Sequence, residues 1–158
     1  MSDSPAPPTP ACEVSLREIS ADTVRSICKL EVHDAQKPFV APNAVSIAEA
    51  HFSEHAWFRA VYAGEAPVGF LMLHDEPEKP EYFLWRMMID ARYQGMGFAR
   101  QAMDLLIRHV RTRPRASALL TSVVQEEGGP QGFYESLGFV LTGAFEDDEA
   151  VMSLDLRP

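Results

Sequence analysis

The fold is decided by Tyr82-Phe83-Leu84-Trp85-Arg86-Met87-Met88-Ile89-Asp90, an apolar run, and by Gln94-Gly95-Met96-Gly97-Phe98-Ala99, the short loop that follows it. The run has the composition of a buried strand, and apolar side chains from Arg100 onward recur at helical spacing. Glycines let the loop turn sharply and approach a ligand closely. The first N–H groups of a helix lack partners and lie at the positive end of its dipole. Strand, glycine loop and helix therefore predict a cradle for an anion such as a pyrophosphate.

Composition limits what the chain can be. Its 158 residues, 46% hydrophobic and 23% charged, predict one globular domain that folds without disulfides. The net charge of −9 argues against a nucleic-acid partner. Cys12 and Cys28 lack CxxC spacing and suit a reduced, cytoplasmic setting. We see no signal peptide and no membrane-spanning apolar run, so no membrane association is expected.

Outside the central stretch, the elements can be predicted in order. Residues 1–12 form a Pro-rich tail that we expect to be disordered, and residues 13–158 form the domain. Ser46 and Glu49 have capping-box spacing, which predicts a helix starting at Ser46. Two prolines predict an extended connection over 33–43. Further strands are expected at 14–19, 57–63, 68–74, 119–124, 138–142 and 150–156, and further helices at 21–32 and 130–137.

Other phosphate motifs match the loop poorly. A dinucleotide-binding fingerprint needs a third glycine, and Arg100 stands where it would be. A P-loop needs a G-K-[ST] sequence, which the chain lacks at this loop. A plain turn between a strand and a helix is the remaining alternative.

The loop resembles a known family. Gln94-x-x-Gly97-x-Ala99 is similar to the [Q/R]-x-x-G-x-[G/A] acyl-CoA loop of the GNAT superfamily of N-acetyltransferases. Arg92-x-x-Gly95-x-Gly97 also fits, but the first register places the helix from Arg100 onward. The segment 132–139, with the sequence GFYESLGF, resembles the late F-Y-x-x-L-G-F block of that family. The resemblance extends from about residue 14 to the end of the chain.

The resemblance implies a fold and a cosubstrate. The expected fold is a three-layer α/β (α+β) domain with a mixed, mostly antiparallel sheet of six to seven strands and about four helices. The expected cosubstrate is acetyl-CoA, with its pantetheine arm along the open end of the central strand and its pyrophosphate on the loop. Arg100 is equally well explained as a surface residue. The implied cofactor-binding residues are Met87, Met88, Ile89, Gln94, Gly95, Met96, Gly97, Phe98, Ala99 and Arg100.

Tyr134 is the implied general acid. A phenol within reach of the leaving thiolate can protonate it, and such catalysis commonly contributes about 10²–10⁴-fold. Without the motif, Tyr134 could equally be an aromatic core residue on a short helix. Many relatives carry Asn about seven residues upstream of this tyrosine, and here that position is Glu127. Contacts made by that Asn are therefore in doubt.

The acceptor can be narrowed further by resemblance. Residues 39–50, 85–90 and 122–134 resemble the spermine/spermidine acetyltransferase branch of the superfamily. We expect direct attack by a polyamine or similar small amine, because neither cysteine lies in a nucleophile motif. The alternatives are a protein, amino acid or aminoglycoside acceptor, or an acyl-CoA sensor without turnover. A homodimer is possible.

The acceptor site is expected to be acidic, although each acid could simply be solvated surface. The candidate general bases are Glu81, Glu126, Glu127 and Glu149. No metal is expected, because the histidines at 33, 51, 55, 74 and 109 lack ligand spacing. The candidate substrate-binding residues are Asp34, Asn43, Trp85, Glu126 and Glu149.

Overall fold

A single mixed sheet forms the centre of the molecule in a computed structural model, which describes residues 6–157. The strand order is β1-β2-β3-β4-β5-β7-β6, and within the described residues only β4 and β5 pair in parallel. This confirms the predicted mixed, mostly antiparallel sheet. The strands are β1 Val14–Arg17, β2 Ala56–Ala63, β3 Ala66–Glu76, β4 Glu81–Ile89, β5 Ala118–Val123, β6 Val140–Glu146 and β7 Glu149–Asp155.

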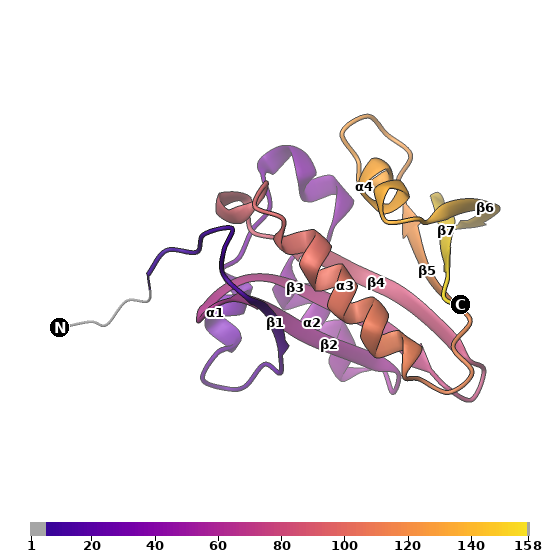
Figure 1. The fold of residues 1–158 in the computed structure, drawn as a ribbon, viewed down its shortest axis with the longest axis horizontal. Helices are drawn as coiled ribbons and strands as arrows, with labels where there is room; N and C mark the ends of the chain where they lie inside the picture. Colours follow the sequence, from indigo (N-terminus) through magenta and orange to yellow (C-terminus); the bar gives the residue numbers. More distant parts are fainter. Residues whose placement is uncertain (1–5, 158) are drawn as a thin grey trace.

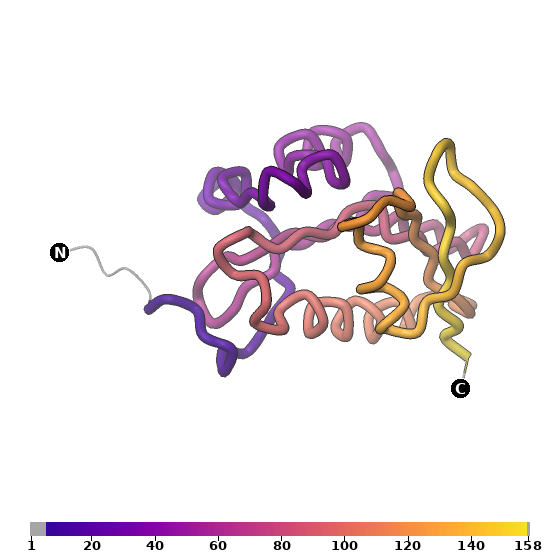
Figure 2. The backbone as a smooth tube through the Cα atoms, turned by 90° about the horizontal axis from the view of Figure 1, so that it is seen from above, coloured from indigo at the N-terminus to yellow at the C-terminus, as the bar shows by residue number. Residues whose placement is uncertain are grey.

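Helices cover both faces of the sheet. α3 crosses one face, with α4 beside it, and α1 and α2 cover the opposite face (Figures 1 and 2). This arrangement is the three-layer architecture that the sequence predicts. The helices are α1 Val24–Cys28, α2 Asn43–His51, α3 Phe98–Arg111 and α4 Gln131–Ser136, with 3-10 helices η1 Asp34–Phe39 and η2 Ala91–Tyr93.

Each face of the sheet has its own apolar core. On one face, α3 buries Phe98, Ala102, Met103, Leu106 and Val110, which recur at helical spacing. Burying one large apolar side chain contributes about 1.5–3 kcal/mol, so this stripe fixes α3 on the sheet. On the other face, a smaller cluster joins the helices to the inner strands; it includes Ile27, Leu30, Ala50, Phe70, Met72 and Met88.

The predicted capping box at Ser46 is wrong. α2 begins at Asn43, with Pro42 as its N-cap, and Ser46 lies inside the helix. The Ser46 hydroxyl is fully buried and has no hydrogen-bond partner within residues 6–157. The helix starts earlier because the buried Asn43 Nδ2 donates to the carbonyl oxygen of Ile27 at 3.0 Å. That tertiary bond outweighs a local capping preference.

The predicted extended connection is wrong over residues 34–39, which form the 3-10 helix η1 with Pro38 inside it. Gln36 closes the turn: its N–H donates to the His33 carbonyl oxygen at 2.8 Å, and its Oε1 accepts from the His33 N–H at 3.1 Å. α1 is also shorter than the predicted 21–32. These short-range bonds shape the segment more strongly than its prolines do.

The predicted tail lies partly outside the described residues, which start at residue 6. Within the described part, the Cys12 N–H donates to the Thr9 carbonyl oxygen at 3.0 Å, which closes a turn. Cys12 packs against the core that lies under α3. The end of the tail is therefore attached to the domain.

Candidate active site

The parallel pair β4–β5 opens partway along its length. Across residues 6–157, β4 pairs with β5 only at Phe83↔Leu120 and Leu84↔Thr121, although β4 continues to Ile89. The same stretch of β4 stays paired with β3 as far as Gly69↔Ile89. An unpaired strand edge offers N–H and C=O groups to an extended ligand. This edge lines a cleft of about 1500 Å³.

The glycine loop forms one end of that cleft. Gly95 and Gly97 have φ values of +80° and +83°, which L side chains rarely adopt. A Cβ added to either would meet no described atom within 4 Å, so the space above them is open. α3 begins at Phe98 with no side-chain cap among the described residues, which leaves its first N–H groups free. The loop therefore fits a pyrophosphate.

Gln94 fastens the loop to its surroundings. Its Nε2 donates to the Ile89 carbonyl oxygen at 2.9 Å and to Gln36 Oε1 at 2.9 Å, while Gln36 Nε2 donates back to Gln94 Oε1 at 3.2 Å. Gln94 lines the cleft, as does Gln36. The Gln94 side chain thus holds the loop in shape against η1. Sequence reasoning missed Gln36, because the pair is 58 residues apart.

Asp90 braces the other side of the loop, and sequence reasoning missed it too. It is 3% exposed and accepts hydrogen bonds from the Glu31 N–H at 3.0 Å, the Arg92 N–H at 2.9 Å and Arg92 Nε at 2.9 Å. Burial raises the pKa of Asp90, but the bonds from Arg92 and Glu31 outweigh it and leave the pKa below its usual value. The signal in the sequence that could have indicated Asp90 is an acidic residue directly after an apolar strand.

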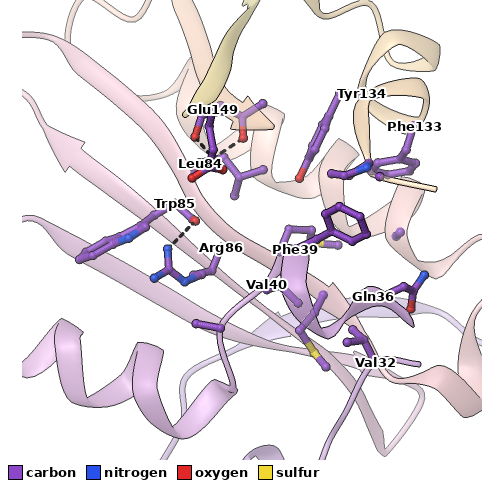
Figure 3. Close-up of a pocket in the computed structure, with 18 of the residues that line it drawn as sticks. Val32, Gln36, Phe39, Val40, Leu84, Trp85, Arg86, Phe133, Tyr134 and Glu149 are labelled. Carbon is purple, nitrogen blue, oxygen red and sulfur yellow. Dashed lines mark hydrogen bonds between the residues drawn. The ribbon is translucent and has the colours of Figure 1, made fainter. Parts of the chain in front are cut away.

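Tyr134 lies on α4, facing the open edge of β4. Its ring is 6% exposed and packs edge-on against Phe133 and Phe139, with ring centroids 5.3 and 5.4 Å away. The hydroxyl end points into the cleft (Figure 3). Burial raises the pKa of Tyr134 to about 12, and a hydrogen bond with Thr121 opposes this only in part. The phenol is therefore protonated at neutral pH and able to donate a proton.

Arg100 joins the two helices that flank the cleft. Its Nη2 donates to Ser136 Oγ at 2.9 Å, and that hydroxyl donates to the Phe133 carbonyl oxygen at 2.6 Å. Arg100 also lines the cleft. It therefore holds α4, and with it Tyr134, next to the glycine loop.

Acidic side chains line the opposite end of the cleft. Glu149 accepts a 3.4 Å hydrogen bond from Ser122 Oγ and lies near Leu84 (Figure 3). Trp85 is on the neighbouring wall, where its carbonyl oxygen accepts from Arg86 Nη1 at 3.1 Å. Both residues were predicted at the acceptor site, and both line the cleft. Glu81, Glu146 and Asp147 line it as well.

Other predicted residues do not line the cleft. Asn43 is buried between α1 and β4, where it bonds Ile27 and approaches Met88 Sδ at 3.5 Å. Asp34 is exposed and pairs with Lys37 at 3.0 Å. Glu126 is an exposed loop residue, and Met96 packs against the core. Of the predicted cofactor-binding residues, all except Met96 line the cleft.

The structure also places the two cysteines relative to the cleft. Cys12 and Cys28 are both free thiols in the described part of the chain, and neither lines the cleft. Within residues 6–157, none of the helices combines the length and the apolar character that spanning a bilayer requires.

Comparisons with known proteins agree with this geometry. The family model described as "Acetyltransferase (GNAT) family" matches residues 24–139. The spermine/spermidine N(1)-acetyltransferase of Bacillus subtilis (strain 168) is 26% identical over 153 residues, covering 90% of this chain and 99% of that protein.

Solved structures share the fold. The ribosomal-protein-S18-alanine N-acetyltransferase from Escherichia coli is 17% identical, with a TM-score of 0.69 over 91% of this chain and 94% of that one. The PaiA N-acetyltransferase from Thermoplasma acidophilum, in complex with coenzyme A, is 10% identical, with a TM-score of 0.69 over 90% and 99%. With an opened β4 edge, a free glycine loop and a family model spanning most of its domain, the chain belongs to the GNAT family and is an acetyl-CoA-dependent N-acetyltransferase.

Proposed function

We propose that this enzyme acetylates a polyamine or a similar small primary amine. The observation that carries the proposal is the group of acids lining the cleft on the β6–β7 hairpin: Glu146, Asp147 and Glu149. Amines are cationic at neutral pH, so carboxylates attract them and hold their distal ammonium groups. The net charge of −9 on the whole chain also attracts cationic amines. Similarity to a spermine/spermidine N(1)-acetyltransferase supports this acceptor class.

The cleft residues have separate roles in this proposal. Acetyl-CoA supplies an activated acetyl thioester. The free edge of β4 at Met87, Met88 and Ile89 holds the extended pantetheine arm through backbone groups, as a neighbouring strand would. The N–H groups of the glycine loop and of the first turn of α3 hold the pyrophosphate. These contacts orient the acetyl carbon toward the acidic end.

Tyr134 then acts as the general acid. Its neutral phenol points into the cleft and donates its proton to the leaving sulfur. The acceptor amine must lose a proton before it attacks, and Glu149 takes it up directly or through water. Ser122 holds the Glu149 carboxylate in place. The amine attacks the thioester directly, since neither cysteine lies at the cleft.

The test is free-thiol release from acetyl-CoA, measured separately with spermidine, spermine, short diamines, lysine peptides and aminoglycosides. We expect fast release with polyamines or diamines. Glu149→Gln should lower kcat and raise KM for the polyamine without changing KM for acetyl-CoA. Glu127→Gln, an exposed acid outside the cleft, is the matched control.

Two results would contradict the proposal. Fast release with only peptides or aminoglycosides would show that one of these, and not a polyamine, is the acceptor. Binding of acetyl-CoA without release for any acceptor would instead favour a sensor.

A further inference from the structure

Imidazole and carboxylate groups gather at the turn end of the β3–β4 hairpin. His74 and Glu76 are two residues apart on β3, so their side chains point to the same face of the sheet. Glu81 on β4 is the direct cross-strand partner of Glu76 and shares that face. His55 lies immediately before β2 and is fixed there by a hydrogen bond from the Asp75 N–H to its carbonyl oxygen at 2.8 Å.

The donor atoms of these side chains converge. One ligand atom each from His74, Glu76 and Glu81 lies within 4.8 Å of the others. His74 Nε2 is 3.0 Å from Glu76 Oε2, and His55 Nε2 is 3.6 Å from Glu76 Oε1. Ligands around a tetrahedral metal ion at 2.0–2.2 Å lie about 3.3–3.6 Å apart, so small rotamer changes would complete a coordination sphere.

We propose that His74, Glu76, Glu81 and His55 bind a divalent transition-metal ion of the Zn²⁺ type. Two imidazoles beside two carboxylates suit zinc and other divalent first-row transition metals, whereas calcium and magnesium prefer all-oxygen sites. The strands fix three of the ligands on one rigid hairpin.

Electrostatics supports the same assignment. Glu76 and Glu81 face each other across the strands, and like charges in that position destabilise a sheet. Lys79 Nζ is 3.6 Å from Glu76 Oε1, but the Lys79 side chain is 69% exposed, so this ion pair stabilises the two carboxylates only weakly. A bound dication would remove this repulsion. This proposal departs from the sequence-based expectation of no metal, because its ligands come from β3, β4 and the residue before β2 and have no motif spacing.

The site adjoins the cleft. His74 and Glu81 both line it, whereas Glu76 does not, and its side chain is 15% exposed. A metal ion here would reduce the negative charge at this end of the cleft. The inference rests on the β3–β4 hairpin and the adjoining His55, and it holds whichever amine the enzyme acetylates.

The experiment is a zinc titration of the full chain, freed of any affinity tag and stripped with a chelator. Isothermal calorimetry should show about one Zn²⁺ per chain, and thermal denaturation should shift to higher temperature as Zn²⁺ is added. Co²⁺ should give the visible d–d absorption of a low-symmetry site. His74→Ala and Glu81→Gln should each weaken Zn²⁺ binding by at least about tenfold.

His51→Ala is the matched control, because His51 is exposed at the end of α2 and outside the cluster. It should bind Zn²⁺ as the wild type does. Circular dichroism establishes that each variant is folded, and Glu81→Gln changes only an exposed side chain. The proposal is overturned if the wild type binds no Zn²⁺, or if the cluster variants bind it as tightly as the wild type.

Discussion

The Thr121 hydroxyl donates a 3.1 Å hydrogen bond to the carbonyl oxygen of Leu84, at the last position where β4 and β5 pair. Thr121 is 3% exposed, so no water replaces this bond if it is lost. Beyond Leu84 the two strands separate and the edge of β4 is unpaired. The bond therefore fixes the point from which β4 opens into the candidate active site.

Thr121→Val should destabilise the fold by about 1–3 kcal/mol, because it leaves the buried Leu84 carbonyl without its partner. Urea denaturation measures the loss. Thr112→Val is the control: the Thr112 hydroxyl also donates to a backbone carbonyl, at 2.6 Å, but in an exposed position where water can substitute. Equal losses in the two variants would show that burial at Leu84 is unimportant.

Gly97→Glu should weaken acetyl-CoA binding at least about tenfold, equivalent to about 1.4 kcal/mol. The new side chain enters the open space above the loop and brings a negative charge toward the phosphates. Calorimetric titration with coenzyme A checks this. Gly143→Glu adds the same charge at φ +87° with equally open surroundings, but outside the cleft. Unchanged affinity in Gly97→Glu would exclude the loop as the phosphate cradle.

Tyr134→Phe should lower kcat by about 10²–10⁴-fold while leaving KM for acetyl-CoA nearly unchanged. The control is Tyr82→Phe, since the buried Tyr82 hydroxyl donates to the Pro114 carbonyl oxygen at 2.6 Å and does not line the cleft. It should cost stability and leave kcat intact. If Tyr134→Phe leaves kcat unchanged, another group supplies the proton to the leaving sulfur.

The pH dependence of Tyr134 follows from its burial. Its pKa is about 12 in the folded chain and about 10 when unfolded, so the acid stays protonated throughout the neutral and mildly alkaline range. Stability from this group is fully present below pH 10 and is lost as the pH rises through 12. Tyrosinate absorbance, compared between wild type and Tyr134→Phe, should show this group ionising last. Ionisation of Tyr134 near pH 10 would contradict its buried position.

Asp90→Asn should destabilise the fold by about 1–3 kcal/mol at pH 7, since four donor atoms converge on this buried carboxylate. Because the folded pKa is lowered, the stabilisation is present above the unfolded pKa and is lost as the pH falls through the folded pKa. The difference between wild type and variant should therefore shrink in acid, as urea denaturation across pH will show.

Asp155→Asn provides the matched control for Asp90. Asp155 accepts the same pair of bonds, from the Arg157 N–H at 2.9 Å and from Arg157 Nε at 3.0 Å, but its side chain is 60% exposed. Solvent screening should make its loss much smaller. Similar effects in both variants would mean that burial contributes little to the Asp90 network.

The local sequence was enough to locate the cleft's main parts. The β4 run, the glycine pair and the α3 stripe each depend on short-range spacing, and all three appear where predicted, although α3 begins at Phe98 and not at Arg100. Tyr134, which was predicted through its motif, lines the cleft. Helix starts were less predictable: Ser46 carries a capping signal, but the buried bond from Asn43 to Ile27 starts α2 three residues earlier.

The sequence by itself determined the order of elements, the glycine loop and the aromatic motif, because backbone preference and apolar period act between near neighbours. Only the tertiary structure decided which polar groups meet. Gln94 meets Gln36 and Asp90 meets Glu31 through bonds spanning 58 and 59 residues, and His55 contacts Glu76 from the turn before β2. Those encounters depend on strand register and on how the layers pack, and spacing along the chain does not encode either directly.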